Sequence, residues 1–175
     1  MTAMPTRPAR TRWIGIGAVG AVFAVTLVPF GPRMARAFAD FELRAPDFTL
    51  WAGVSPVVKL HVYAALTALA IGAVILFRPK GRGLHKILGW SWVIAMATTA
   101  VSSLFIMEVN NGFFSFIHLL SGWTIIALPM AIFAIRNRKV DVHRRTMTGM
   151  FVGGLLVAGL LSFIPGRIMF EMFFG

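Results

Sequence analysis

The sequence has no cysteine and only six acidic residues among its 175 residues. Without a thiol, the chain forms no disulfide, no thiolate metal site and no cysteine nucleophile. No acidic residue lies within a long apolar stretch, which excludes a serine–histidine–acid arrangement inside one. A glycine-rich phosphate loop after a strand and a paired-histidine zinc motif are also missing. No hydrolytic or transferase site is visible, and enzyme activity, if there is any, is at most that of a membrane oxidoreductase.

Apolar residues dominate what is present. They make up 58% of the chain, charged residues make up 13%, and the mean hydropathy is +0.80. A soluble domain of this length cannot bury so much apolar surface, so the lipid bilayer is the expected solvent. Five stretches approach or meet the roughly 20 apolar residues that a membrane-spanning helix requires. They are residues 13–30, 56–77, 87–107, 114–135 and 146–164.

These stretches predict an all-α, integral membrane protein built as an up-and-down bundle of five transmembrane helices. Short turns join the last four helices, which form a four-helix core, and the N-terminal helix is added to it. Residues 1–55 are expected to hold the N-terminal transmembrane helix and an outer interfacial segment. Residues 56–175 are expected to form the four-helix transmembrane core domain. Ser55 and Pro56 are typical of an N-cap and a first-turn proline at the start of the second helix.

The basic residues indicate the orientation of the helices. Seventeen basic and six acidic residues give a net charge of +11. In a soluble protein, such a charge would suggest nucleic-acid binding. Basic residues that lie between apolar spans instead indicate which side of the membrane each loop occupies. We therefore expect no nucleic-acid partner. Twelve of the seventeen fall on one side of the alternating path, and the positive-inside rule assigns that side to the cytoplasm. The N-terminus is then cytoplasmic and the C-terminus lies outside.

The first stretch has a second interpretation. A basic start, an apolar run and Ala35-Arg36-Ala37 resemble a secretory signal with its cleavage site, so the first helix is either a signal anchor or a cleaved signal. The segment from Arg33 to Trp51, in which Met34 and aromatic residues alternate with charges, suits either an amphipathic interfacial segment or a connecting loop.

The four histidines are distributed one to each of the last four predicted helices. His61 and His118 lie near the outer ends of the second and fourth helices, and His85 and His143 lie at the cytoplasmic ends of the third and fifth. In a four-helix bundle, the second and fourth helices face one another diagonally, as do the third and fifth. Two imidazoles at equal depth are suitable axial ligands for haem iron. The pattern therefore predicts two stacked bis-histidine haem sites.

Two other roles for these histidines remain open. An ionisable group inside a membrane marks a functional site, so the same side chains suit a proton or substrate path. They also suit purely structural hydrogen bonding. Small residues such as Gly72, Gly89, Gly122 and Gly154 follow the histidines and leave room for a flat cofactor, although such residues also allow helices to pack closely.

Several motifs resemble the domain of unknown function 2306 family, a set of bacterial predicted membrane proteins. The resemblance covers about residues 56 to 168 and implies a membrane fold in the bacterial cytoplasmic (inner) membrane, crossed several times, but it implies no activity. The motifs are His85-Lys86-Ile87-Leu88-Gly89, Phe116-Ile117-His118-Leu119-Leu120-Ser121, His143-Arg144-Arg145-Thr146-Met147 and Ile164-Pro165-Gly166-Arg167.

The histidine pattern alone is also similar to the di-haem b-type cytochromes that pass electrons across membranes. This looser resemblance implies haem b as cofactor, with His61, His118, His85 and His143 as ligands of the haem iron, but no ascorbate-site motif accompanies it.

Three functions follow as hypotheses. The first is transmembrane electron transfer, with a cytoplasmic donor, a quinol or another membrane redox partner. The second is a small transporter or proton pathway. The third is an accessory subunit of a larger membrane complex.

Overall fold

The computed structural model describes residues 32, 46–81, 83–106, 116–165 and 167–174. The chain divides into two compact units, residues 1–42 and 43–175, and only Pro32 of the first unit is described. The predicted span at residues 13–30, with its possible cleavage site, lies outside the described residues. Every regular element among the described residues is a helix, which confirms the all-α prediction for that part of the chain.

Helix α4 spans Pro56–Phe77, the range that the sequence predicts for the second span. Ser55 is its N-cap, because the serine hydroxyl accepts a hydrogen bond from the Val58 N–H at 3.4 Å. Pro56 occupies the first turn, where an N–H has no partner within the helix. These two residues fix the start of the helix locally, which explains why the sequence located it.

Helix α5 spans Gly83–Ser103 and therefore begins and ends four residues before the predicted range of 87–107. The apolar stretch predicted the start of this helix too late, because His85 and Lys86 are helical but too polar to be counted in an apolar stretch. In the turn from α4, Gly81 has φ 84°, a conformation that glycine adopts without strain.

Helix α6 spans Phe116–Arg136, close to the predicted 114–135. The chain then turns back into a helical rod made of α7 (Val140–Gly149), the π-helix η3 (Met150–Val157) and α8 (Ala158–Leu161). We call these three elements the C-terminal rod. The rod begins before the predicted residue 146, because its first turns carry charged residues that still favour a helix.

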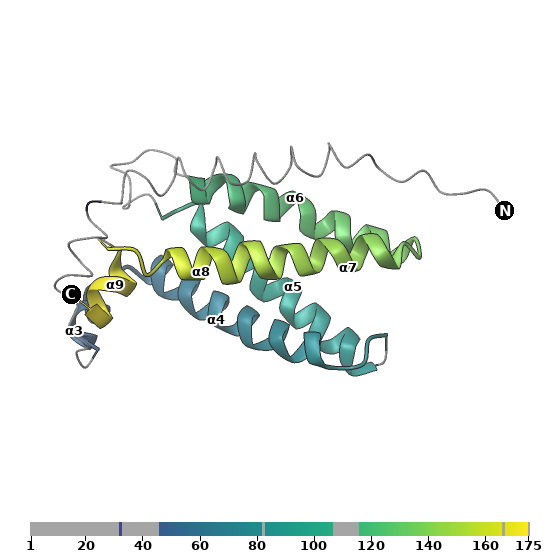
Figure 1. Cartoon of the computed structure of the whole chain (residues 1–175), viewed down its shortest axis with the longest axis horizontal. Coiled ribbons are helices and arrows are strands. Elements are labelled where there is room, and N and C mark those ends of the chain that lie inside the picture. The colour runs from purple at the N-terminus through teal and green to yellow at the C-terminus, as the bar shows by residue number, and fades with distance from the viewer. Residues whose placement is uncertain (1–31, 33–45, 82, 107–115, 166, 175) are drawn as a thin grey trace. The chain divides into compact units, whose positions relative to one another are not determined.

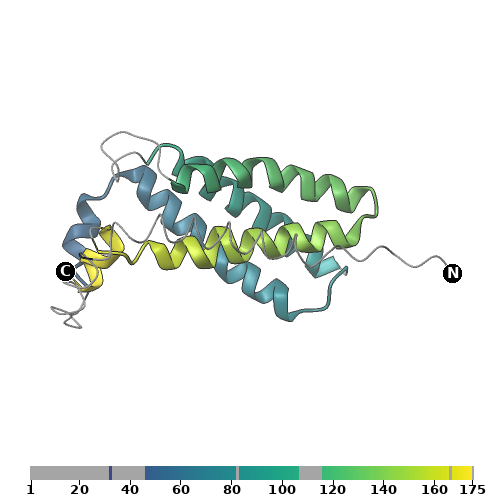
Figure 2. The same ribbon diagram turned by 45° about the horizontal axis from the view of Figure 1, so that its top comes forward.

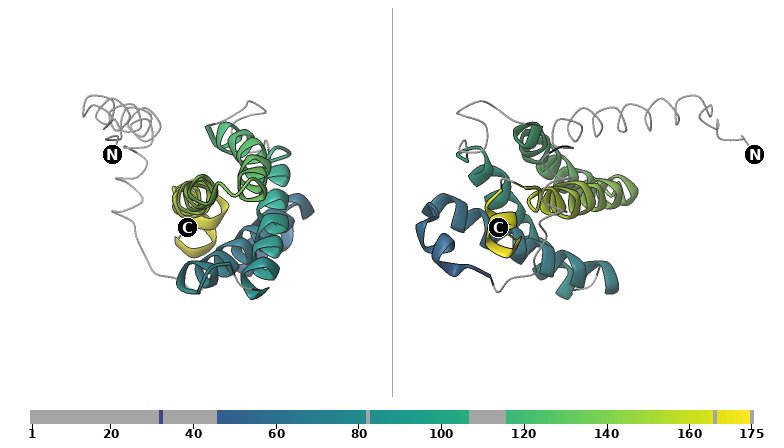
Figure 3. Two further views of the ribbon diagram at one scale, coloured as in Figure 1. Left: turned by 90° about the vertical axis from the view of Figure 1, so that its right-hand side faces the viewer. Right: turned by 60° about the vertical axis from the view of Figure 1, so that its left-hand side comes forward.

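The four long helical segments surround one core (Figures 1 and 2). α4 packs along α5, α5 packs against α6, and η3 lies against both α4 and α6. Seen along the bundle, α4 and α6 are therefore on opposite corners, and so are α5 and the C-terminal rod (Figure 3). This is the up-and-down order that the short turns predict for the last four helices.

Two short helices lie together at one end of the bundle, α3 (Phe48–Gly53) and α9 (Ile168–Phe174). The Asp47 N–H donates to the Met172 carbonyl at 2.9 Å and joins the two segments. At the opposite end are the α4–α5 turn and the turn between α6 and α7 (Figure 1). We call the second end the basic end, since its described residues include Arg78, Lys80, Lys86, Arg136, Arg138, Lys139, Arg144 and Arg145.

The faces of α6 have the polarity expected in lipid. Its exposed stripe is formed by large apolar side chains, with Leu119 71% and Ile126 60% exposed, whereas its buried stripe contains His118, Ser121 and Thr124. An exposed apolar stripe opposite a buried polar one is the reverse of a water-soluble helix.

Two described helical stretches, Pro56–Phe77 and His118–Arg136, are long and apolar enough to cross a membrane. Hydroxyl, imidazole and ammonium groups make α5 less apolar, and the C-terminal rod is divided among three elements. The prediction of five spans therefore stays a prediction, as does the domain boundary at residue 55.

Candidate functional site

The four histidines lie in two groups at opposite ends of the bundle. His61 in α4 and His118 in α6 are at the α3–α9 end, and His85 in α5 and His143 in α7 are at the basic end. We call these groups the upper level and the lower level. From His85 to Thr99, which contacts His61, α5 rises about 21 Å at about 1.5 Å per residue. The two levels are thus separated by most of the length of the bundle.

At the upper level, His61 reaches across to α5. Its Nδ1 lies 2.9 Å from the Thr99 carbonyl oxygen and 3.2 Å from the Ser102 hydroxyl oxygen. A carbonyl oxygen only accepts, so the proton of a neutral His61 ring belongs on Nδ1 and Nε2 carries the lone pair. The imidazole is therefore held in one tautomer by the neighbouring helix.

Buried hydroxyl groups extend this contact to α6. The Ser103 and Ser121 hydroxyls hydrogen-bond to one another, and Ser121 lies one helical turn after His118. His118 is itself buried, at 8% exposed. The hydroxyls therefore bridge α5 and α6 beside both upper histidines. We call this group the hydroxyl cluster; it contains Thr99, Ser102, Ser103, Ser121 and Thr124.

At the lower level, His143 repeats the arrangement of His61. Its Nδ1 lies 2.9 Å from the carbonyl oxygen of Ala131 in α6, which again leaves Nε2 as the basic nitrogen. His85 lies close enough to His143 and Lys80 for their charges to act on it. Burial, and then those two positive charges, lower the pKa of His85 below its ordinary 6.5.

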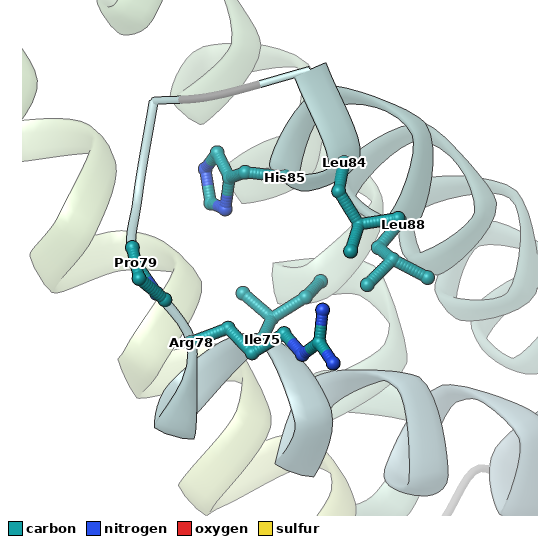
Figure 4. Close-up of a pocket in the computed structure, with 6 residues that line it drawn as sticks. All are labelled: Ile75, Arg78, Pro79, Leu84, His85 and Leu88. Atoms are coloured by element: carbon teal, nitrogen blue, oxygen red, sulfur yellow. The ribbon is translucent and has the colours of Figure 1, made fainter.

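A pocket of about 190 Å³ adjoins His85 at the basic end. The imidazole lies on one side of it and the Arg78 guanidinium on another, with apolar side chains between them (Figure 4). We call it the basic-end pocket; it is lined by Ile75, Arg78, Pro79, Leu84, His85 and Leu88.

Tightly packed apolar side chains fill the bundle between the two levels. Met96 and Met150 are almost completely buried there, and Phe151 packs against Gly72 and Trp92. We call this region the apolar layer; it contains Ala68, Trp92, Ala95, Met96, Ala127, Leu128, Met150, Phe151 and Leu155.

The room that small residues were expected to leave beside the histidines is present at some positions and filled at others. A Cβ atom at Gly89 or Gly122 would meet nothing within 4 Å, and these glycines follow His85 and His118 by one helical turn. In contrast, a Cβ at Gly72 would lie 2.5 Å from Phe151, and one at Gly154 would lie 2.8 Å from Met96.

Each histidine pair offers two imidazole ligands, fewer than a bare metal ion usually takes from a protein. Among the described residues there is no group of three or more histidine, cysteine or acidic side chains that could hold a metal. A porphyrin supplies four nitrogen ligands and leaves two axial positions, so a pair of imidazoles is sufficient. A ring N–H donated to a backbone carbonyl, as His61 and His143 provide, is the usual support for a ligating histidine.

Sequence reasoning identified the histidines but underestimated the hydroxyls. Serine hydroxyls in helices commonly bond back to their own backbone, as Ser102 does to the Thr98 carbonyl and Ser103 to the Ala100 carbonyl. Their contacts with neighbouring helices are an additional role. The signal that points to it is the spacing of His118, Ser121 and Thr124, which places three polar side chains on one face of an otherwise apolar helix.

Comparison with known proteins gives a family and no relative of known activity. No curated protein and no solved structure matches the chain. A family described as "Predicted membrane protein (DUF2306)" matches residues 58–173, which include all four histidines and all of the bundle except the first two residues of α4. This match covers more than half of the sequence and confirms the first resemblance. The chain therefore belongs to the DUF2306 family of predicted membrane proteins.

Proposed function

We propose that this membrane protein transfers electrons across the bilayer through haem b held at two levels. His61 and His118 would hold one haem, and His85 and His143 the other. Bound haem iron would supply reversible one-electron chemistry at each level. The donor would be a cytoplasmic reductant or a quinol, with the basic end and the N-terminus on the cytoplasmic side of a bacterial inner membrane.

The observation that carries this proposal is the repeated orientation of the histidine rings. One histidine of each pair places Nδ1 2.9 Å from a backbone carbonyl of an adjacent helix: Thr99 for His61, and Ala131 for His143. Each ring is thereby held with a basic Nε2 before any ligand binds. The same device at both ends of the bundle is easier to explain by two similar sites than by two unrelated structural contacts.

The helix order also supports paired ligands. α4 and α6 occupy opposite corners of the bundle, as do α5 and the C-terminal rod, so each proposed pair lies on helices that face one another across the core.

The apolar layer favours electrons over protons as the charge that crosses the whole bundle. A proton path needs a continuous chain of hydrogen-bonding groups or water, and tightly packed Met96, Met150 and Phe151 interrupt such a chain. Electron transfer between two cofactors needs no such continuity.

The hydroxyl cluster favours proton exchange as a second function, limited to the upper level. His61 contacts Ser102, and Ser103 contacts Ser121, so buried groups that accept and donate protons lie side by side. To act as a transporter or as a proton pathway across the whole membrane, the protein would also need a conformational change that separates the packed side chains of the apolar layer.

The haem proposal is tested by a reduced-minus-oxidised absorption spectrum of detergent-purified protein expressed with added haem. We expect Soret and alpha bands, with His61→Ala and His143→Ala each losing part of the signal and the double variant losing all of it. Thr67→Ala, on the exposed side of α4, is the control and should keep the full spectrum. A monodisperse but colourless wild-type protein would contradict the proposal.

Proton movement is tested separately in liposomes that contain a pH-sensitive dye. If the second function applies, an imposed pH difference should decay faster with wild-type protein than with His61→Gln, and the difference should not require haem. Equal decay rates for the two proteins would exclude His61 from a proton path.

A further inference from the structure

The basic-end pocket combines one strong cation with an apolar lining. Arg78 is the exposed charged residue among the six that line it, and Ile75, Leu84 and Leu88 supply aliphatic surface (Figure 4). A guanidinium forms paired hydrogen bonds with phosphate or carboxylate oxygens. The aliphatic surface matches a hydrocarbon chain, so the pocket suits an anionic amphiphile.

The charges around the pocket favour an anion strongly. Lys80 is close by, with its ammonium group 2.8 Å from the Leu76 carbonyl oxygen, and its charge acts on His85. Among the described residues at this end, the single acid is Asp141, whose carboxylate already lies 3.3 Å from Arg144. No described carboxylate therefore neutralises Arg78.

The surroundings of the pocket place it at the edge of the hydrocarbon region. Phe77, next to Arg78, is 89% exposed, and Ile87 on α5 is 65% exposed. Such side chains are expected to face lipid tails, while Arg78 and Lys80 lie at the level of the headgroups. A ligand that enters from the membrane meets both parts of the pocket at the correct depth.

We propose that the basic-end pocket binds an anionic phospholipid, with its phosphate on Arg78 and an acyl chain on Ile75, Leu84 and Leu88. Basic pockets between transmembrane helices are typical sites for anionic headgroups. The inference does not depend on the haem proposal, because it assigns no contact with the phosphate to His85.

The test uses delipidated, detergent-purified protein and native mass spectrometry with phosphatidylglycerol or phosphatidylcholine of identical acyl chains. We expect preferential retention of phosphatidylglycerol and a loss of about fivefold in that retention for Arg78→Gln, the amount that one basic residue contributes near a membrane surface. Arg136→Gln removes a guanidinium from the same end but outside the pocket, and should leave retention unchanged.

Two further arms separate the lipid from other ligands. Leu88→Trp fills the apolar side of the pocket without changing its charge, and should weaken retention of phosphatidylglycerol as well. Inorganic phosphate at the concentration of the lipid should not displace it; displacement would show a site for free phosphate and overturn the lipid assignment. Equal retention by wild type, Arg78→Gln and Leu88→Trp would overturn the proposal altogether.

Discussion

Individual residues determine how closely the helices approach one another in the apolar layer. At Gly72, a Cβ atom would lie 2.5 Å from the Phe151 ring and 2.8 Å from the indole nitrogen of Trp92. These two buried side chains come from η3 and α5, so the absence of a side chain at Gly72 lets three elements meet. The indole nitrogen has no hydrogen-bond partner among the described residues.

We predict that Gly72→Ala lowers the free energy of unfolding by about 1–3 kcal/mol, the usual cost of adding a carbon to a filled core. The measurement is the denaturant midpoint in detergent. Gly89→Ala is the matched control: nothing lies within 4 Å of its added Cβ, so the helix should be unchanged or more stable by up to about 1 kcal/mol. Equal losses in both variants would contradict this account of the packing.

His85 makes stability depend on pH at the lower level. Its pKa is below the ordinary 6.5 because of burial and then the charges of His143 and Lys80. As pH falls through 6.5, the unfolded chain therefore binds a proton that the folded chain resists, and stability declines. We predict that the melting temperature falls between about pH 7.5 and about pH 5.5. It should fall less in His85→Gln, and parallel pH profiles would contradict the prediction.

At the scale of the element, α6 shows how one helix can serve lipid and core together. Its outward stripe is apolar throughout, from Leu119 to Phe133, and its inward stripe changes from polar at His118 to alanine at Ala131. The polar part supplies Ser121, which hydrogen-bonds to Ser103 of α5, and the alanine part lets the C-terminal rod approach closely enough for His143 to reach the Ala131 carbonyl.

We predict that Ile126→Arg, in the exposed stripe of α6, opposes membrane insertion by about 2.5–3.5 kcal/mol, the cost of a charge at the centre of a spanning helix. Membrane-fraction yield of a tagged protein measures the effect. Val142→Arg is the control, because Val142 is also exposed but lies at the basic end, before the predicted span at 146–164. If both variants insert as well as wild type, the exposed stripe of α6 does not face lipid.

At the scale of the whole molecule, the absence of cysteine allows the topology to be measured directly. Single variants Lys80→Cys, Arg138→Cys and Thr49→Cys place one thiol each in the two basic turns and in α3. We predict that a membrane-impermeant maleimide applied to intact spheroplasts labels Thr49→Cys, and that the two basic-turn variants react only in inside-out vesicles. Labelling of a basic turn in intact spheroplasts would reverse the proposed orientation.

The sequence by itself determined the all-α class of the described part of the chain and the order of its four long helical segments, but it did not predict the short helix α9. α4 was predicted to the residue because Ser55 and Pro56 act locally, whereas the start of α5 was missed because His85 and Lys86 are helical but not apolar. The levels of the four histidines also followed from the sequence, since alternating helix direction and a fixed rise per residue determine depth.

Only the tertiary structure decided which way each side chain turns. It directs His61 to the Thr99 carbonyl, joins Ser103 to Ser121, fills the space beside Gly72 with Phe151, and forms an open pocket between Arg78 and His85. The physical reason is that a helix in lipid is apolar on most of its surface, so its own pattern leaves its rotation undetermined. That rotation is set by packing against helices distant in the sequence, and it decides which histidines and hydroxyls meet.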